Sequence, residues 1–479
     1  MAQRGNAQGR RRQAHGAGVA PKDADTEYDL IVLGSGAAGS SAATTAAQAG
    51  RRVALIERGV LGGTCLNYGC DPTKTLLHTA RLFTQARQAD RYGLRIPTAS
   101  ADWSAVVARA QQVITRMRGG NPAQAARALR TQGVTVFHGE AQFVAPDAVE
   151  VNGTRLRGAN IMIATGAENI IPPIEGLREA GYITNIEAVT LPALPQRLAI
   201  IGGGANGIEF AQIFTRFGVA VTLLERSNAV LDTEDQELAC MLVEQLRADG
   251  VRIETQAEVR RVEAISEGKR LTIQCADRRE EALDVDQVLL ALGRKPALDG
   301  LGLDAAGVVY DEHGVQVDAT LRTNVAHIWA AGDALGRYQF THVASAQGEL
   351  AARNAFAEQR QPFDERVIPW AIFTEPELAR VGRTEEQLRQ QGQTFRVLRV
   401  SFEDVERAII TGQTAGEVKL LTDQDGAVLG CHILAVNAGE LIAPVVLALR
   451  AGLPAQALGD LLLPYPTMAE AVRNAARGA

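Results

Sequence analysis

Two of the five cysteines in this 479-residue chain, Cys65 and Cys70, lie in the stretch GGTCLNYGCDPTK (residues 62–74), which ends in Lys74. Thiols this close together serve three kinds of chemistry: half of a metal site, a structural disulfide, or a disulfide that opens and closes during catalysis. The other three cysteines are scattered, unlike the framework of a secreted disulfide-rich protein. The pair is therefore expected to be redox-active or metal-binding in a reducing compartment.

Composition narrows the class of protein. A length of 479 residues predicts about three domains. The formal net charge of −6 argues against a nucleic-acid partner, because phosphate contacts need a basic face. No apolar run reaches the roughly 20 residues that cross a bilayer, so we expect a soluble, cytoplasmic protein without a membrane partner. Residues 1–26 are basic and polar and lack the apolar core of a secretory signal. A mitochondrial presequence would be Ser-rich and amphipathic, so a disordered tail is favoured.

Two segments carry the same pattern: YDLIVLGSGAAGSSAATTAAQAGRRVALIERG from Tyr28, and QRLAIIGGGANGIEFAQIFTRFGVAVTLLERS from Gln196. Each predicts a strand, a glycine loop, a helix and a second strand that ends at an acid. The shared positions are Gly34, Gly36, Gly39 and Glu57 in the first segment, and Gly202, Gly204, Gly207 and Glu225 in the second. This context fits the dinucleotide fingerprint, in which the glycines admit the pyrophosphate and the acid binds a ribose. The sequence predicts two nucleotide sites, one for a resident cofactor and one for an exchanging cofactor.

Three later segments also end strands at glycine turns. IMIATGAENIIPP (residues 161–173) and VLLALGRKPALDGLGL (residues 288–303) each predict a strand and a turn, and HIWAAGDA predicts a buried strand before Asp333. From about Arg366 the pattern changes to strands and helices without a fingerprint. We expect an α/β protein with two Rossmann-like dinucleotide-binding domains and a C-terminal α+β domain. The expected boundaries are 27–155 and 286–355 for the two parts of the first domain, 156–285 for the second, and 356–479 for the third.

Together these motifs resemble the class I flavoprotein disulfide oxidoreductases, the group of dihydrolipoamide dehydrogenase, glutathione reductase and mercuric reductase. The likeness runs from about Tyr28 to Asn474. GGTCLNYGCDPTK resembles the family's G-G-T-C-x-N-x-G-C-x-P-[ST]-K, HIWAAGDA its flavin-ribityl motif, and FTEPELARVG and AGELI its dimerisation domain. The resemblance implies FAD on the first fold, NAD(P)H on the second, and a homodimer built by the C-terminal domain. The implied cofactor-binding residues, beyond the two glycine loops, are Glu57, Thr64, Lys74, Ala141, Thr165, Gly166, Asp333 and Ala344 for FAD, and Glu225 and Gly293 for the nicotinamide nucleotide.

The resemblance also implies that Cys65 and Cys70 form a redox disulfide, with Cys70 nearer the flavin and Cys65 facing the substrate. The chemistry of the segment agrees. A metal site needs about four ligands, and His78 is the only imidazole nearby. A structural disulfide that closes so short a loop would add little stability. A cysteine at a helix start is different, because the positive end of the helix dipole stabilises the thiolate that exchange requires.

Two charged residues complete the implied centre. Lys74 would supply positive charge beside the flavin, and Glu209 matches the family's acid that pairs with this lysine. Asp71 departs from the family, which usually has an aliphatic residue after the second cysteine. A carboxylate at this position should raise the pKa of the neighbouring thiol unless it points away.

The C-terminal segment LLLPYPTMAEAVRNAA also departs from the pattern. Members that reduce organic disulfides carry His-Pro-x-x-x-Glu here, and that histidine crosses the dimer interface as a general acid–base. This chain has Tyr465 at the histidine position, with Glu470 at the expected spacing. Mercuric reductases have a similar Pro-Tyr-x-Thr-Met-x-Glu segment. They also typically have a C-terminal vicinal cysteine pair, which is absent here, and many have an N-terminal Cys-x-x-Cys domain.

Three functional hypotheses follow. The first is an NAD(P)H-dependent reductase of a metal ion, a small oxidised thiol or another oxidant. The second is a dihydrolipoamide dehydrogenase whose histidine has been replaced, and the third is a flavoprotein redox sensor or partner-binding protein with little turnover. NADH is expected to be preferred to NADPH, because Glu225 would repel a ribose 2′-phosphate, although Arg226 tempers this. No resident metal is expected.

Overall fold

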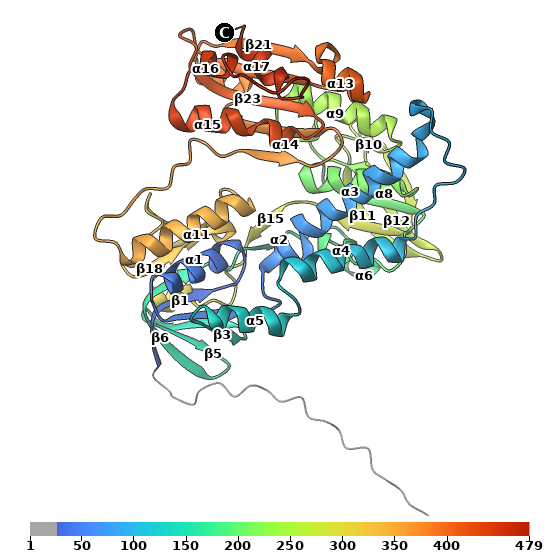
Figure 1. Ribbon diagram of the computed structural model, residues 1–479. Coiled ribbons are helices and arrows are strands. Elements are labelled where there is room, and N and C mark those ends of the chain that lie inside the picture. The colour runs from blue at the N-terminus through green and yellow to red at the C-terminus, as the bar shows by residue number, and fades with distance from the viewer. Residues whose placement is uncertain (1–25, 479) are drawn as a thin grey trace, which may run out of the picture.

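The computed structural model describes residues 26–478, which form three units (Figure 1). The first unit carries the first glycine loop, the second unit carries the second, and the C-terminal unit follows them. The predicted disordered tail, residues 1–26, lies outside the described residues except for Thr26, which begins strand β1. The predicted fold class, two dinucleotide folds and a C-terminal α+β domain, is confirmed.

The first unit is built on a seven-stranded sheet in the order β3-β2-β1-β6-β5-β4, with β18 paired to β6. Strands β1, β2, β3, β6 and β18 run parallel, and β4 and β5 are antiparallel. The strands are β1 (Thr26–Leu33), β2 (Val53–Glu57), β3 (Val134–His138), β4 (Ala141–Ala145), β5 (Ala148–Val151), β6 (Thr154–Ile163) and β18 (Ile328–Ala330), with a small pair β16 (Tyr310–Asp311) and β17 (Gly314–Val315) nearby. The helices are α1 (Ala37–Gln48), α2 (Gly63–Tyr68), α3 (Cys70–Arg87), α4 (Trp103–Met117), α5 (Pro122–Thr131), α10 (Leu303–Ala306) and α11 (Thr341–Phe356), with short 3₁₀ turns η1 (Ala89–Tyr92) and η2 (Gly332–Leu335).

Small residues let α1 and α11 cross closely beside this sheet, as Figure 1 shows. A Cβ atom added at Gly348 would lie 2.1 Å from the carbonyl oxygen of Ala38, so only glycine fits there. The apolar strands β1 and β2 are buried, as expected for parallel strands covered on both faces. This packing holds the middle of α11 against the start of α1.

The second unit has a parallel four-stranded sheet, β10-β9-β8-β14, and an antiparallel three-stranded sheet, β11-β12-β13. Its strands are β8 (Arg197–Ile201), β9 (Ala220–Leu224), β10 (Arg252–Glu254), β11 (Glu258–Ile265), β12 (Gly268–Gln274), β13 (Glu280–Val285) and β14 (Gln287–Leu290). Its helices are α6 (Leu177–Ala180), α7 (Asn185–Ala188), α8 (Ala205–Arg216) and α9 (Gln236–Ala248). Two short strands, β7 (Ala167–Asn169) and β15 (Arg294–Pro296), pair antiparallel where the chain passes between the units.

Strand pairing moves two of the expected boundaries. The expected break at 155/156 falls inside β6, which pairs with β1 as far as Ile163 and so belongs to the first sheet. The expected break at 285/286 falls just before β14, which pairs with β8 and so belongs to the second sheet. In both cases the chain adds one more parallel strand to its sheet before it passes to the next unit: β6 pairs with β1, and β14 pairs with β8.

The C-terminal unit is an antiparallel five-stranded sheet in the order β19-β20-β23-β22-β21, covered by short helices. Its strands are β19 (Trp370–Ile372), β20 (Glu377–Gly382), β21 (Arg396–Ser401), β22 (Glu417–Thr422) and β23 (Val428–Ala435). Its helices are α12 (Glu385–Gln390), α13 (Glu406–Thr411), α14 (Ala438–Leu441), α15 (Ala443–Ala451), α16 (Ala455–Gly459) and α17 (Glu470–Ala476), with a 3₁₀ turn η3 (Phe402–Asp404).

A buried lysine joins the C-terminal unit to the second unit. The ammonium of Lys419 on β22 lies 2.7 Å from Asp235 Oδ2 at the start of α9 and 2.9 Å from Glu237 Oε2, and it also pairs with Glu385. Lys419 is almost fully buried, and a buried charge is tolerated only when it is paired in this way. The cluster therefore fixes the two units in one relative position.

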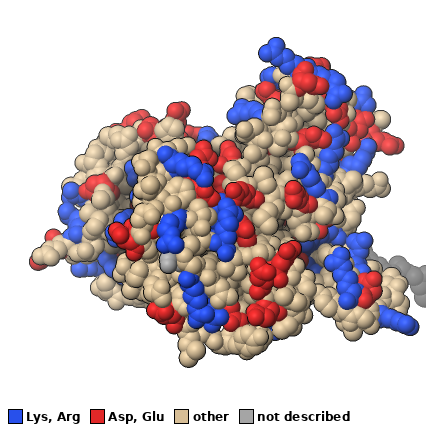
Figure 2. Space-filling view, turned by 90° about the horizontal axis from the view of Figure 1, so that it is seen from above, with Lys and Arg blue, Asp and Glu red and all other residues tan. Residues whose placement is uncertain are grey.

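Among residues 26–478, no helix is both long and apolar enough to cross a membrane. On the face seen in Figure 2, lysine and arginine side chains are interspersed with aspartate and glutamate, without a broad field of one sign.

Candidate active site

The three glycines of the first loop have different structural roles. Gly34 has a φ of +100°, and a Cβ there would lie 2.4 Å from Ala164 O. A Cβ at Gly39 would lie 1.9 Å from Gly34 O, so this glycine allows helix α1 to pack on the loop. A Cβ at Gly36 would meet nothing nearer than 4.0 Å. The middle glycine thus faces open space, as it must if a pyrophosphate approaches the backbone there.

The second loop repeats this geometry. Gly202 has a φ of +112°, and its Cβ would lie 2.4 Å from Ala291 O, while that of Gly207 would lie 2.0 Å from Gly202 O. Around Gly204 a Cβ would meet no atom within 4 Å. Gly36 and Gly204 are the N-caps of α1 and α8, and neither helix start has a side-chain cap. Both loops therefore present free N–H groups where a phosphate would bind.

The two acids end their strands in equivalent places. Each accepts backbone N–H hydrogen bonds from its glycine loop and from the residue two positions later: Glu57 from Ser35 (2.9 Å) and Gly59 (2.7 Å), and Glu225 from Gly203 and Ser227 (both 2.7 Å). A carboxylate has about four acceptor positions, so each acid retains capacity for ribose hydroxyl groups. The residues of both folds fit a bound dinucleotide.

The remaining predicted cofactor residues lie around the first loop and the passage between the units. Thr64 is in α2, Ala344 is in α11, Asp333 is in η2, and Ala141 begins β4. Thr165 and Gly166 lie between β6 and β7, and Gly293 precedes β15. Their cofactor contacts stay predictions.

Sequence reasoning missed Arg294, which links several of these segments. Its guanidinium lies 2.7 Å from Asp333 Oδ2 and 3.4 Å from Thr64 Oγ1, and it donates to the carbonyl of Ala167. Burial raises the pKa of Asp333, and the charge of Arg294 opposes that rise. The arginine stands in the segment VLLALGRKPALDGLGL, from which a strand and a glycine turn were predicted but no role for Arg294.

The cysteine pair lies where α2 meets α3. Cys65 is inside α2, and Cys70 is the first residue of α3, so the predicted helix start at a cysteine is found at Cys70. No disulfide joins them in this structure, and the redox disulfide stays a prediction. A hydrogen bond from the Cys65 thiol is the main reason that the pKa of Cys70 is lowered to about 6. The same bond, with burial, raises the pKa of Cys65.

Asp71 raises the pKa of Cys70, as expected of a neighbouring carboxylate, but other groups outweigh it. Its charge raises the pKa of Cys70, whereas the hydrogen bonds of Cys65 and Thr341 and the charge of Lys74 lower it. Burial raises the pKa of Asp71 itself, and the charge of Lys74 opposes that rise. The balance leaves Cys70 as the more acidic thiol of the pair.

Lys74 and Glu209 are brought together from α3 and α8. Lys74 Nζ lies 3.0 Å and 2.8 Å from the two carboxylate oxygens of Glu209. Glu209 also accepts a 2.9 Å hydrogen bond from the backbone N–H of Phe373, whose ring centroid lies 4.7 Å from Lys74 Nζ. Burial alone would lower the pKa of Lys74, but Glu209 outweighs it and the pKa is raised. The lysine is therefore a fixed positive charge.

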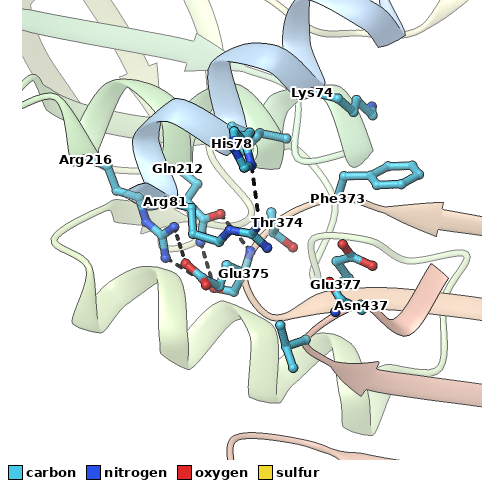
Figure 3. Close-up of a pocket in the computed structure, with 12 residues that line it drawn as sticks. Lys74, His78, Arg81, Gln212, Arg216, Phe373, Thr374, Glu375, Glu377 and Asn437 are labelled. Carbon is cyan, nitrogen blue, oxygen red and sulfur yellow. Dashed lines mark hydrogen bonds and ion pairs between the residues drawn. The ribbon is translucent and has the colours of Figure 1, made fainter. Parts of the chain in front are cut away.

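Beside this pair lies a cavity of about 180 Å³ between α3, α8 and the segment that follows β19 (Figure 3). Lys74 and Phe373 lie together on one side of the view, and Arg216 with Glu375 on the other. Arg216 is held by Asp249 and Glu375, at 3.1 Å and 2.8 Å. Neither cysteine lines this cavity, so it is separate from the dithiol.

Tyr465 lies in the segment between α16 and α17. Its side chain is 71% exposed, and its hydroxyl has no hydrogen-bond partner among the described residues. Glu470, which begins α17, is buried and accepts hydrogen bonds from the N–H of Thr467 (3.1 Å) and from Arg473 Nη2 (2.8 Å). The structure thus presents the tyrosine outward, as a residue that acts on a second subunit would require, and its role stays a prediction.

In the part of the chain that the structure describes, no three side chains of His, Cys, Asp or Glu are grouped so that they could hold a metal ion.

Two residues of the site, Arg294 and Thr341, belong to no sequence motif identified above. Thr341 Oγ1 lies 3.4 Å from Cys70 Sγ across 271 residues of sequence. Only the packing of α11 brings these two together.

Two dinucleotide folds that enclose a dithiol and a fixed ammonium define a class: an oxidoreductase that moves an electron pair between a nucleotide and sulfur. Comparison with known families agrees. The pyridine nucleotide-disulphide oxidoreductase family matches residues 28–348, and its dimerisation domain matches residues 368–476. The chain belongs to this family, which uses FAD and NAD(P)H, and it is an enzyme of that kind. The predicted family and enzyme class are confirmed.

Characterised relatives fall into several substrate classes. Mercuric reductase of Staphylococcus aureus is 35% identical over 454 residues, which are 94% of this chain and 82% of the relative. Dihydrolipoyl dehydrogenase of Bacillus subtilis is 34% identical over 453 residues, which are 93% of this chain and 97% of the relative. The structure of the HOCl-induced flavoprotein disulfide reductase RclA from Escherichia coli matches with a TM-score of 0.84 and 32% identity, covering 94% of this chain and 99% of RclA. These likenesses support the family rather than one substrate.

Proposed function

We propose that this enzyme passes electrons from NAD(P)H through FAD to the Cys65–Cys70 pair and from there to a metal ion, a small oxidised thiol or another oxidant. FAD, held by the first glycine loop and Glu57, would supply two-electron transfer between the nicotinamide and sulfur. The chain would contribute the rest: Cys65 and Cys70 store the pair as two thiols, and Lys74, held by Glu209, keeps a positive charge in the site. Reduction of an organic disulfide then consumes NAD(P)H and a proton and releases two thiols.

One arrangement carries this proposal: Cys70 begins helix α3, the Thr341 hydroxyl lies 3.4 Å from its sulfur, and Lys74, paired with Glu209, follows on the same helix. Cys70 has its pKa lowered to about 6, while that of Cys65 is raised. A structural pair would not need such a difference, whereas exchange needs one thiolate at neutral pH. Cys65 would be the sulfur that meets substrate, and Cys70 the sulfur that receives electrons.

The proposed terminal electron acceptor follows from Tyr465, which stands where disulfide-reducing members of the family have a histidine. With tyrosine in place of histidine, this position offers a phenol instead of the imidazole that would protonate a leaving thiolate, and reduction of a metal ion needs no such protonation. Two electrons reduce Hg(II) to Hg(0), or two Cu(II) ions to Cu(I). A mercuric reductase is among the relatives, and the E. coli RclA protein has also been solved as a Cu(II) complex. These points favour a metal ion or an oxidant as the acceptor.

The second candidate is a dihydrolipoamide dehydrogenase with a replaced histidine, which the Bacillus subtilis relative favours. Against it, its thiol substrate must lose a proton to a base, and Tyr465 is a poor base at neutral pH. The third candidate is a redox sensor or partner-binding protein, in which the pair would be oxidised and reduced without rapid turnover.

Steady-state NADH oxidation separates the three. We expect turnover with Hg(II), Cu(II) or a small disulfide, slow oxidation of dihydrolipoamide, and loss of turnover in Cys65→Ser and Cys70→Ser. Rapid dihydrolipoamide oxidation would select the second candidate. Normal reduction of the pair by NADH, with no turnover on any of these acceptors, would select the third.

We further propose a cytoplasmic homodimer that prefers NADH. The C-terminal unit matches a dimerisation domain, and it exposes large apolar side chains: Ile409, Ile410, Leu447, Leu453, Leu462 and Tyr465. Exposed large apolar side chains on a unit of this family are available to be buried between two copies of the chain. Sedimentation equilibrium tests the dimer, since a monomer at micromolar concentration would exclude it. The NADH preference is argued from Glu225, which accepts hydrogen bonds and would repel a 2′-phosphate.

A further inference from the structure

The Cys70 sulfur has a second polar neighbour from a distant part of the chain. Thr341 Oγ1 lies 3.4 Å from Cys70 Sγ, within the range of a hydrogen bond to sulfur. The Thr341 hydroxyl has no other hydrogen bond among residues 26–478. A hydroxyl is one donor and can serve a thiolate, so its geometry leaves Cys70 as the partner.

The start of α11 is held firmly, so this hydroxyl is positioned rather than mobile. The ring of Phe340, the N-cap residue, stacks on that of Trp370 at 5.3 Å and on that of His342 at 5.7 Å. Gln339 Nε2 donates a 2.9 Å hydrogen bond to the carbonyl of Arg294. Anchors on both sides of Thr341 fix the distance between its oxygen and the sulfur.

Two helix starts meet at Cys70. The cysteine is the first residue of α3, which has 18 residues, and Thr341 is the first residue of α11, which has 16. The first N–H groups of a helix lack partners within it, and the positive end of the helix dipole favours an anion. An anionic Cys70 sulfur is therefore stabilised from two directions, and Thr341 adds a directed hydrogen bond.

The charged and titratable groups around Cys70 come from three helices. Cys65 of α2 donates a hydrogen bond, Lys74 of α3, paired with Glu209 of α8, attracts a thiolate, and Asp71 of α3 repels it. Thr341 is the uncharged donor of the set. It also lowers the pKa of Cys65, but the hydrogen bond of its hydroxyl is with Cys70.

We propose that Thr341 is a catalytic residue whose hydroxyl donates a hydrogen bond to the Cys70 sulfur and stabilises the thiolate of that cysteine. The inference rests on the proposed redox role of the pair, since it assigns the two sulfurs their different tasks. Thr341 acts at the reacting atom through a neutral group, and its effect does not depend on salt as that of Lys74 does.

Two substitutions isolate the hydroxyl. Thr341→Val keeps the branched shape and removes the donor, and Thr341→Ser keeps the donor and removes a methyl group. Thr79→Val is a matched control, because Thr79 lies on α3 with its hydroxyl on the carbonyl of Thr75 rather than on sulfur. Flavin absorbance and melting temperature of each holoenzyme report whether it folds. If Thr341→Val does not fold, Thr341→Ala replaces it.

The measurement is the rate at which iodoacetamide alkylates Cys70 in the reduced holoenzyme at a series of pH values. Tandem mass spectrometry of the tryptic peptide 59–74, which holds both cysteines, separates the two sulfurs. In the wild type we expect Cys70 to react half-maximally near the lowered pKa of about 6. Thr341→Val should move that midpoint upward by about one unit, because a hydrogen bond to a charged group is lost. Thr341→Ser and Thr79→Val should leave it within about 0.3 unit.

An unchanged midpoint in Thr341→Val, or an equal shift in Thr341→Ser, overturns the proposal. Alkylation needs neither NADH nor an electron acceptor. An enzyme that turns over no acceptor, yet shows the Thr341→Val shift, would refute the proposed function and leave the role of Thr341 intact.

Discussion

Lys74 and Glu209 form an ion pair whose two sides differ in their access to water. The side chain of Lys74 is 31% exposed, and that of Glu209 is 2% exposed, while Nζ and Oε2 are 2.8 Å apart. If Glu209 is neutralised, the ammonium can still be partly hydrated. If Lys74 is removed, the carboxylate is left buried with only the N–H of Phe373 as a partner.

This asymmetry predicts unequal losses of stability. Lys74→Met should destabilise the holoenzyme by about 3–5 kcal/mol, the usual result of leaving a buried charge unpaired. Glu209→Gln should cost about 1–3 kcal/mol, because one charge-assisted hydrogen bond is lost. The double variant Lys74→Met/Glu209→Gln should be more stable than Lys74→Met alone. Denaturant midpoints of the three variants decide the order, and a double variant that is no more stable than Lys74→Met would contradict it.

The ionisation of Cys70 predicts a pH-dependent spectrum. Holoenzyme reduced by one equivalent of NADH or dithionite should show a long-wavelength charge-transfer band from the Cys70 thiolate. Because the pKa of Cys70 is lowered to about 6, the thiolate and its band persist at neutral pH and are lost as the pH falls through about 6. Cys70→Ser should lack the band at every pH, and a band that survives in this variant would reverse the assignment of the two sulfurs.

The partner cysteine supplies a control for that spectrum. Hydrogen bonding from Cys65 is the largest contribution to the lowered pKa of Cys70. Cys65→Ala should therefore keep the band but move its midpoint to higher pH. A midpoint that stays near 6 in Cys65→Ala would mean that this hydrogen bond does not determine the acidity of Cys70.

Glu225 and Glu57 are equivalent acids of the two repeated folds, so their variants test the preference for NADH with a matched control. Glu225→Ala removes the acid of the second fold, and Glu57→Ala removes the equivalent acid of the first. We expect Glu225→Ala to reduce the ratio of kcat/KM for NADH to that for NADPH by about 10-fold or more, since charge repulsion of a 2′-phosphate is relieved. Glu57→Ala should weaken FAD retention and leave that ratio unchanged. A wild-type enzyme whose kcat/KM for NADPH equals or exceeds that for NADH would contradict the predicted preference for NADH.

How much of this site can be read from sequence depends on how far apart its residues lie. The glycine loops, Glu57 and Glu225 are local patterns, because a strand, a tight turn and a helix bring the acid back to the loop within one unit. The cysteine pair and Lys74 lie within one turn-and-helix segment. Thr341 reaches Cys70 only because small residues let α11 pack on α1, and no local pattern encodes that contact.

The same reasoning explains the other differences. Arg294 stands in a segment whose glycine turn was evident, but its partners Asp333 and Thr64 come from two other segments. The expected boundaries differ from the strand pairing because β6 joins β1, and β14 joins β8, across long separations in sequence. Parallel strands pair across long sequence separations, so the sequence indicates that a strand exists more reliably than it indicates the sheet to which it belongs.

The last prediction concerns Tyr465. If the lack of a histidine limits disulfide chemistry, reduction of the pair by NADH should proceed normally and only the thiol–disulfide step should be slow. Tyr465→His should then raise turnover of dihydrolipoamide or of a small disulfide by part of the roughly 10² to 10⁴-fold that general acid–base catalysis provides. Hydrogen bonds from Thr467 and Arg473 hold the Glu470 carboxylate in place, and this carboxylate is expected to orient the new imidazole. The double variant Tyr465→His/Glu470→Ala lacks that acid, so its gain should be smaller.

Tyr465→Phe separates a role in the acceptor step from a role in packing. The hydroxyl is exposed and has no partner among the described residues, so its removal should not destabilise a single subunit. If Tyr465 contacts the acceptor, Tyr465→Phe should lower Hg(II)-dependent NADH oxidation and leave the reduction of the pair unchanged. Stopped-flow measurement of the two half-reactions decides the matter. Equal effects on both half-reactions, or no effect on either, would mean that the tyrosine only packs at the interface between two subunits.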